Sequence, residues 1–173
     1  KSRSEVNLES RLGTKSYTLP IISSPMDTIT STEMALAMEK AGGLGVVHRY
    51  CSIAEQIEKI SYEGIRAAAI GVTGDYVDRV ASLYSAGIRI FCLDVAHGDH
   101  SHMEVAIRRI KDTYGEEVHV MAGNVATKEA YERLSKWGAD SVRVGIGGGS
   151  ICSTRIQTGH GMPTFQSVLD CSQ

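Results

Sequence analysis

The sequence lacks several features that would assign a protein to a class at once. No apolar run approaches the about 18 residues of a transmembrane helix, and no signal peptide opens the chain. The net charge is only −2, and lysine and arginine are spread along the chain. No basic face therefore favours nucleic acid or a membrane surface. We expect a cytoplasmic protein that binds neither.

Cysteine is scarce, and its spacing excludes two common uses. The four cysteines lie far apart without a CxxC pair: Cys51, Cys92, Cys152 and Cys171. This spacing indicates reduced thiols rather than a disulfide framework. The three histidines that follow Asp94 (His97, His100 and His102) fit no standard zinc pattern, so a transition-metal site is disfavoured. Because the chain starts at Lys1 rather than methionine, we expect it to be a trimmed part of a longer protein.

What the sequence does contain is a repeated strand–helix unit. Six nearly continuous apolar runs predict parallel strands buried on both faces: Leu19–Ser24, Leu44–His48, Arg66–Gly71, Arg89–Val95, Val118–Gly123 and Ser141–Gly145. The stretches between them predict five helices: Thr32–Lys40, Ile53–Tyr62, Asp75–Ser85, Met103–Tyr114 and Lys128–Lys136. A further helix starts within "TFQSVLDC". Glycines that precede several strands, such as Gly42, Gly87 and Gly138, suit helix C-termini.

Such a series forms either an open doubly wound sheet or a (βα)8 barrel. Polar residues gather just after the predicted strands, where a barrel brings them into one ring. No GxGxxG follows the first strand, so the dinucleotide-binding doubly wound sheet is disfavoured. We therefore predict an α/β fold of the TIM-barrel type. We expect residues 1–173 to form a single catalytic barrel domain that covers roughly the first six βα units, with the C-terminal part of the barrel absent.

The segment "GIGGGSICSTR" (residues 145–155) is the strongest candidate for chemistry. Its glycines allow the backbone to turn amides toward a phosphate or carbonyls toward a monovalent cation, although glycine loops are often simple turns. Cys152 is a candidate nucleophile, because loop amides and Arg155 favour a thiolate, and Thr154 is placed to assist. The alternative is a small buried cysteine without a chemical role. Ser150 adds a hydroxyl that suits a phosphate.

Two other strand ends carry polar side chains. Asp94 closes an apolar strand, where an acid orients a polar cofactor group or pairs with a cation. Asn124 in "MAGNVAT" offers an amide that both donates and accepts, which suits a sugar hydroxyl. A turn or helix-capping role is the alternative for Asn124.

Together these segments resemble the IMP dehydrogenase and GMP reductase family. The resemblance rests on "SRSEVNL", "IISSPMDTIT", "GGLGVVHR", "CLDVAHG", "MAGNVAT" and above all "VGIGGGSICSTRIQTGHGMP", in family order. It implies a (βα)8 barrel in which Cys152 attacks C2 of a purine nucleotide and hydride moves between C2 and a nicotinamide. Thr154 would assist the second half-reaction.

The resemblance also implies the binding residues. Those for the nicotinamide cofactor are Ser2, Arg3, Arg49, Asp94, Val95, Ala96, Ile146 and Gly147. Those for the purine nucleotide substrate are Met26, Asn124 and Ser150, and those for a potassium ion are Gly147, Gly149, Cys152 and Arg155. A homotetramer is the implied assembly. Gly148 departs from the proline that the family usually has there, which frees the loop and weakens the case for a bound cation.

Within the family, we expect an NADPH-dependent GMP reductase. A single predicted helix connects His48 to "IRAAAIG", which leaves no room for the CBS modules that most of the dehydrogenases insert there. The alternatives are an IMP dehydrogenase without CBS domains that uses NAD, and a non-catalytic half-barrel that binds nucleotides. An unrelated barrel enzyme acting on a phosphorylated sugar is a further rival. Because the second half of the barrel is missing, we expect the 173-residue chain alone to be inactive.

Overall fold

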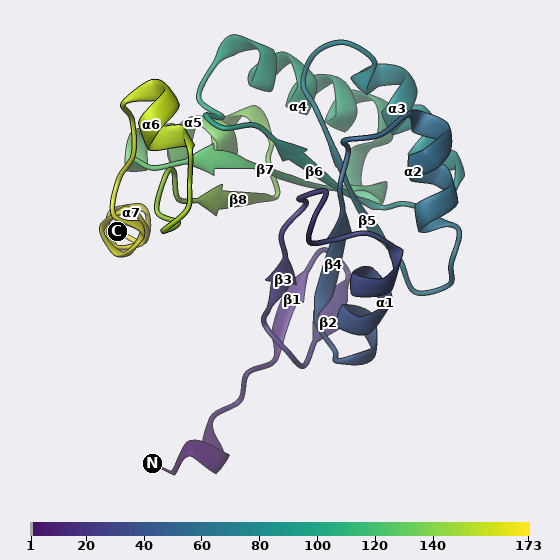
Figure 1. Ribbon diagram of the computed structural model, residues 1–173, viewed down its shortest axis with the longest axis horizontal. Coiled ribbons are helices and arrows are strands. Elements are labelled where there is room, and N and C mark those ends of the chain that lie inside the picture. Colours follow the sequence, from purple (N-terminus) through teal and green to yellow (C-terminus); the bar gives the residue numbers. More distant parts are fainter. Residues whose placement is uncertain (1) are drawn as a thin grey trace.

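The computed structural model describes residues 2–173 and consists of one curled parallel sheet with helices on its outer side (Figure 1). The sheet has the order β3-β4-β5-β6-β7-β8, so every strand pairs with its neighbour in sequence. The strands are β3 (Ile22–Ser23), β4 (Leu44–Val47), β5 (Ala67–Ile70), β6 (Ile90–Asp94), β7 (His119–Val125) and β8 (Ser141–Val144). The predicted barrel is confirmed as a half-barrel with the six expected strands.

The helices follow the strands as the βα repeat predicts. They are α1 (Thr32–Lys40), α2 (Ile53–Ile60), α3 (Tyr76–Ser85), α4 (Ser101–Tyr114), α5 (Lys128–Trp137), α6 (Thr154–Thr158) and α7 (Thr164–Cys171). Ser52 and Glu55 form the predicted capping box of α2, and the Thr127 hydroxyl caps α5. Gly138 ends α5 with a φ of +107°, a conformation that favours glycine. No helix in residues 2–173 has the length and apolar character to cross a membrane.

Apolar side chains pack on both faces of the sheet, which explains the continuous apolar runs. Successive residues of a strand point to opposite faces. Val46 therefore belongs to the inner cluster with Cys92 and Met121, whereas Val47 belongs to the outer cluster with Phe91. The helices cover the outer cluster, and the inner cluster fills the concave side of the sheet.

The structure adds elements at both ends that the sequence did not predict. A hairpin of β1 (Ser10–Leu12) and β2 (Lys15–Tyr17) precedes the sheet and contributes Tyr17 to the inner cluster. Before it, the short helix η1 (Arg3–Glu5) lies in an arm that extends away from the sheet (Figure 1). The predicted strand Leu19–Ser24 is reduced to β3, because only two of its residues pair with β4. Thr154 and Arg155, predicted as loop, begin α6 instead.

Candidate active site

The candidate site lies at the carboxyl ends of β6, β7 and β8, where parallel strands bring distant residues together. Asn124 anchors the glycine loop, because its Nδ2 donates to the Gly145 carbonyl at 3.1 Å. The Gly145 amide donates to the Val125 carbonyl at 2.7 Å. The loop that carries Cys152 is thus fixed to the end of β7. A contact between Asn124 and a nucleotide stays a prediction.

Cys152 lies at the end of this loop, directly before α6, and is half-buried. The pKa of its thiol is lowered, chiefly by a hydrogen bond with the Thr154 hydroxyl and then by the Thr154 backbone amide. The positive charge of Arg155 acts in the same direction. A lowered pKa increases the thiolate fraction near neutral pH, and the thiolate is the nucleophilic form of cysteine.

The other three cysteines differ from Cys152 in this respect. Burial raises the pKa of the Cys92 thiol to about 11, and Cys92 is fully buried. Burial also raises the pKa of Cys51 and of Cys171. Cys152 is therefore the one cysteine whose surroundings favour the thiolate, as the sequence predicted for a nucleophile.

This difference predicts the order in which iodoacetamide modifies the thiols. Cys152 is expected to react first, while Cys92 stays unmodified. The pH at which the alkylation rate of Cys152 is half-maximal (its midpoint) is expected to be lower than for an ordinary thiol. Replacing Thr154 by valine removes the hydroxyl and is expected to move the Cys152 midpoint to higher pH, since the thiolate loses its main stabilising contact. Alkylation across a pH series, read by peptide mass spectrometry, measures both. Thr113→Val on the exposed side of α4 is the matched control, and an unchanged midpoint in Thr154→Val would contradict the assignment.

A cluster of charge lies beside β6. Arg143 of β8 forms an ion pair with the Asp94 carboxylate and contacts the Cys92 sulfur at 3.5 Å. Arg49 donates through Nη2 to the Asp94 carbonyl at 3.1 Å, and its buried Nε has no hydrogen-bond partner among residues 2–173. Arg49 and Asp94, both predicted to bind the cofactor, are thus in contact. The Arg49 Nε is a donor available to a ligand.

Sequence reasoning missed Arg143, although the sequence contains a signal for it. Arg143 stands in the short strand "SVRV" between two valines, and a charged side chain that is partly buried in a sheet is usually paired with an opposite charge. Its side chain borders a hollow of about 170 Å³ on the concave side of the sheet. The hollow is lined by Ile22, Ser23, Ser24, Pro25, Val46, Cys92, Met121 and Arg143.

Of the other residues predicted to bind the cofactor or the substrate, only some lie near Cys152 or the end of β6. Val95 exchanges backbone hydrogen bonds with Gly123 and Asn124, whereas Ala96, Met26 and Ser150 are exposed. Ile146 is buried and Gly147 adopts a φ of +71° in the same loop as Cys152. Ser2 and Arg3 lie in the extended arm, and their hydrogen bonds involve only residues 2–6.

Two of the four residues predicted to bind potassium, Gly149 and Arg155, use their carbonyls for hydrogen bonds within the chain. The Gly149 carbonyl accepts from the Cys152 amide at 3.1 Å and from Arg155 Nη2 at 3.0 Å. The Arg155 carbonyl accepts from the Gly159 amide at 3.0 Å. Because the Arg155 guanidinium provides a positive charge at the Gly149 carbonyl, that carbonyl is already used in this arrangement of the loop. Potassium binding stays an untested prediction.

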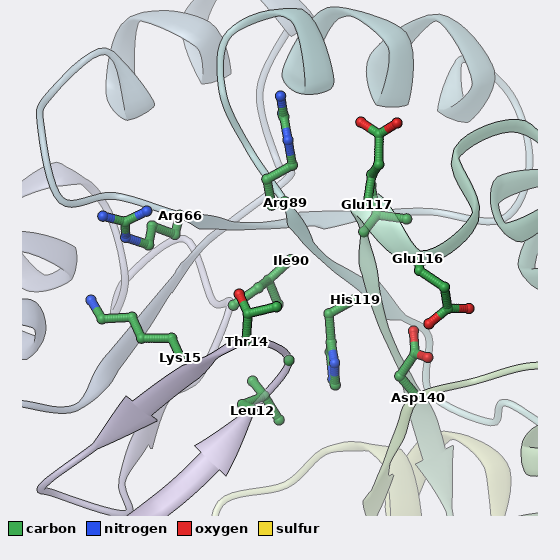
Figure 2. A pocket seen from close by; sticks show the side chains of 12 residues that line it. Leu12, Thr14, Lys15, Arg66, Arg89, Ile90, Glu116, Glu117, His119 and Asp140 are labelled. Atoms are coloured by element: carbon green, nitrogen blue, oxygen red, sulfur yellow. The ribbon is translucent and has the colours of Figure 1, made fainter.

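Another hollow lies at the opposite end of the sheet, beneath the tip of the β1–β2 hairpin (Figure 2). It measures about 350 Å³ and is lined by charged groups of both signs. Its carboxylates are engaged: Asp140 pairs with Lys111 at 3.1 Å, and Glu117 accepts from the Tyr84 hydroxyl. This end holds the amino ends of the strands, whereas barrel enzymes place their chemistry at the carboxyl ends.

Comparison with known proteins identifies the family of the chain. The model of the family described as IMP dehydrogenase / GMP reductase domain matches residues 1–173. A GMP reductase of Buchnera aphidicola subsp. Acyrthosiphon pisum is 34% identical over 185 residues, which cover 99% of this chain and 52% of that protein. An inosine-5'-monophosphate dehydrogenase of Borreliella burgdorferi is 32% identical over 223 residues, which cover 96% of this chain and 55% of that protein.

A second dehydrogenase matches a smaller part of the chain at higher identity. The inosine-5'-monophosphate dehydrogenase of Bacillus subtilis is 44% identical over 108 residues, covering 62% of this chain and 22% of that protein. The chain spans about half the length of the curated relatives that it matches along nearly all its residues. With the family match extending over all 173 residues, the chain belongs to the IMP dehydrogenase and GMP reductase family of oxidoreductases.

Proposed function

We propose that the protein is a GMP reductase, which converts GMP to IMP and ammonia at the expense of NADPH. The observation that carries the proposal is Cys152, a half-buried thiol with a lowered pKa at the carboxyl ends of the strands. The direct connection of β4 to β5 through α2, without an inserted module, supports a reductase over most dehydrogenases. A GMP reductase is also among the relatives that match nearly the whole chain, with 34% identity along 99% of it.

In this proposal Cys152 performs covalent catalysis. Its thiolate attacks C2 of the guanine ring and forms a C–S bond, and the 2-amino group leaves as ammonia after taking up protons. NADPH, when bound, supplies the hydride that reduces C2, and the C–S bond then breaks to release IMP and the thiolate. Thr154 stabilises the thiolate at the start and at the end of this cycle, because its hydroxyl hydrogen-bonds with the sulfur.

The end of β6 suits the cofactor in this scheme. Arg49 offers a buried Nε donor without a partner in the described chain, next to the carbonyl of Asp94. Such a donor suits an oxygen atom of the cofactor, while the ion pair with Arg143 holds the Asp94 carboxylate in place. We extend the proposal to a homotetramer, on the family resemblance alone.

The experiment that tests the proposal follows nicotinamide absorbance with the protein encoded by the complete gene. One sample contains GMP and NADPH, and the other contains IMP and NAD. Oxidation of NADPH with GMP is the expected result. Reduction of NAD with IMP would instead make the protein an IMP dehydrogenase, the second candidate, which the 32% identity to the Borreliella enzyme over 96% of the chain favours. A folded protein silent in both samples would overturn both assignments.

A further inference from the structure

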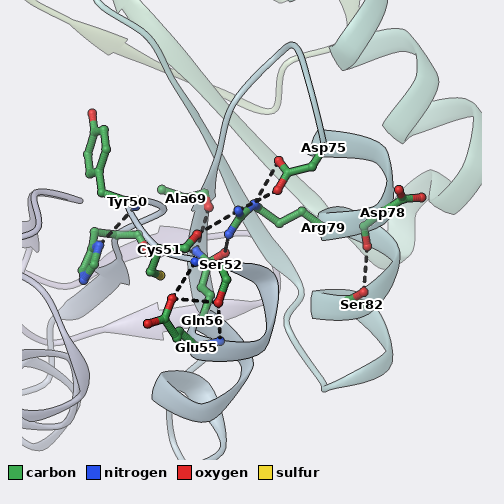
Figure 3. A network of polar contacts seen from close by, with 11 residues as sticks. Tyr50, Cys51, Ser52, Glu55, Gln56, Ala69, Asp75, Asp78, Arg79 and Ser82 are labelled. Atoms are coloured by element: carbon green, nitrogen blue, oxygen red, sulfur yellow. Dashed lines mark hydrogen bonds and ion pairs between the residues drawn. The ribbon is translucent and has the colours of Figure 1, made fainter.

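A buried amide joins the ends of two strands next to the candidate site (Figure 3). Gln56 of α2 is fully buried, and its Nε2 donates to the His48 carbonyl at 3.0 Å and to the Ala69 carbonyl at 2.9 Å. Its Oε1 accepts from Arg79 Nη1 at 2.7 Å. Because a guanidinium only donates, the Oε1 atom must face Arg79, and both amide hydrogens are left for the two carbonyls.

Arg79 extends this network from α3. It is 6% exposed, and its Nη2 donates both to the Cys51 carbonyl at 2.9 Å and to Asp75 Oδ2 at 2.8 Å. The Asp75 carboxylate neutralises the buried guanidinium, and a buried charge requires such a partner. Asp75 stands at the N-cap of α3 but makes no side-chain capping bond, since its carboxylate is used for Arg79.

The network fixes the loop between β4 and α2 at several points. Gln56 binds it at His48, Arg79 binds it at Cys51, and the Ser52 capping box closes its end. Arg49 lies between these points, with its guanidinium 5.0 Å from the centre of the Tyr50 ring. From there Arg49 reaches the Asp94 carbonyl. The position of Arg49 therefore depends on a loop whose own carbonyls are tied to Gln56 and Arg79.

We propose that Gln56 and Arg79 are positioning residues that hold the His48–Ser52 loop, and through it Arg49, against the end of β6. The role of Arg49 toward the cofactor rests on the proposed function, whereas the positioning of the loop does not. A network that served only the global fold would have no need to bind this loop at two separate carbonyls. Gln56 and Arg79 touch no reacting atom, so they act through Arg49.

The test replaces Gln56 by leucine, a side chain of similar size, and measures the alkylation rate of Cys51. Loss of the amide removes the donor that Gln56 supplies to the His48 and Ala69 carbonyls, so the loop is expected to open and Cys51 to react at least about tenfold faster. Cys92 is the internal control, because it is fully buried in the sheet and reacts only when the whole domain unfolds. Gln166→Leu on the exposed side of α7 is the matched variant, with no change expected.

Either of two outcomes would overturn the proposal. If Cys51 and Cys92 become reactive together in Gln56→Leu, the network supports only the global fold. If neither changes, the network does not hold the loop. Arg79→Lys tests the second residue, because lysine keeps the charge but loses the two-pronged geometry of the guanidinium. In this variant, hydrogen exchange of peptides covering residues 48–52 is expected to become faster if Arg79 holds the loop.

Activity measurements add the link to Arg49. In an active protein, Gln56→Leu is expected to raise the KM for the nicotinamide cofactor more than it lowers kcat, and to have little further effect once Arg49 is alanine. If Gln56→Leu raises the KM for the cofactor equally in the wild type and in Arg49→Ala, Gln56 does not act through Arg49. If the wild-type protein turns over neither nucleotide, the proposed function fails, while the Cys51 measurement still decides the positioning role.

Discussion

Replacing Cys152 by alanine is expected to lower GMP-dependent oxidation of NADPH by at least about a thousandfold, because the covalent step has no substitute nucleophile. The other cysteines cannot take over. Cys92 is buried with a pKa raised to about 11, and Cys51 lies in the loop after β4. The measurement is kcat/KM from absorbance of the reduced cofactor, with nucleotide binding followed separately.

The matched control is Cys171→Ala, which removes a half-buried thiol at the end of α7 and is expected to leave turnover unchanged. Nucleotide binding by Cys152→Ala should persist, since the glycine loop and Asn124 remain in place. Substantial turnover by Cys152→Ala would contradict covalent catalysis. It would mean that C2 is reduced without a covalent bond to Cys152.

The strand–helix repeat was predictable because each signal for it is local. Buried parallel strands need continuous apolar runs, and helix ends need glycine, so both are visible in the sequence. The β1–β2 hairpin has no such signal. Its three-residue strands are polar or mixed, as in "SRL" and "KSY", and their stability comes from burying Tyr17 against the inner cluster. A contact of that kind depends on residues distant in sequence.

Dependence on residues distant in sequence also explains why the buried network of Gln56 and Arg79 was not predicted. Gln56 and Arg79 stand in amphipathic helices, where a glutamine or arginine ordinarily indicates the exposed face. Only the approach of α2 to α3 and to the ends of β4 and β5 turns them into a buried network. The lowered pKa of Cys152 could be predicted for the opposite reason, since Thr154 and Arg155, which lower it, are near neighbours in the chain.

Gly148 shows how a tertiary contact changes the interpretation of a sequence. From the sequence, glycine in place of the family's usual proline indicates a looser loop. In the structure, a Cβ at position 148 would come within 1.9 Å of Thr164 Oγ1, at the start of α7. The glycine therefore allows the loop to pack closely against α7, and Thr164 would have to move to accommodate any larger residue.

The second large effect is expected at Arg143. Replacing it by methionine leaves the Asp94 carboxylate without its charged partner, and breaking a buried pair in this way is expected to lower the free energy of unfolding by about 3 kcal/mol. The two side chains are 25% and 17% exposed, so solvent compensates little of the loss. Denaturant unfolding of Arg143→Met against wild type measures the difference.

The control is Arg108→Met, which breaks an exposed ion pair with Glu104 on α4 and is expected to change stability by less than about 1 kcal/mol. The double variant Asp94→Asn with Arg143→Met separates charge from packing. If the stranded carboxylate causes the loss, neutralising it restores much of the stability, because no unpaired charge remains. If the double variant is as unstable as the single one, the loss comes instead from the packing of the Arg143 side chain beside Cys92.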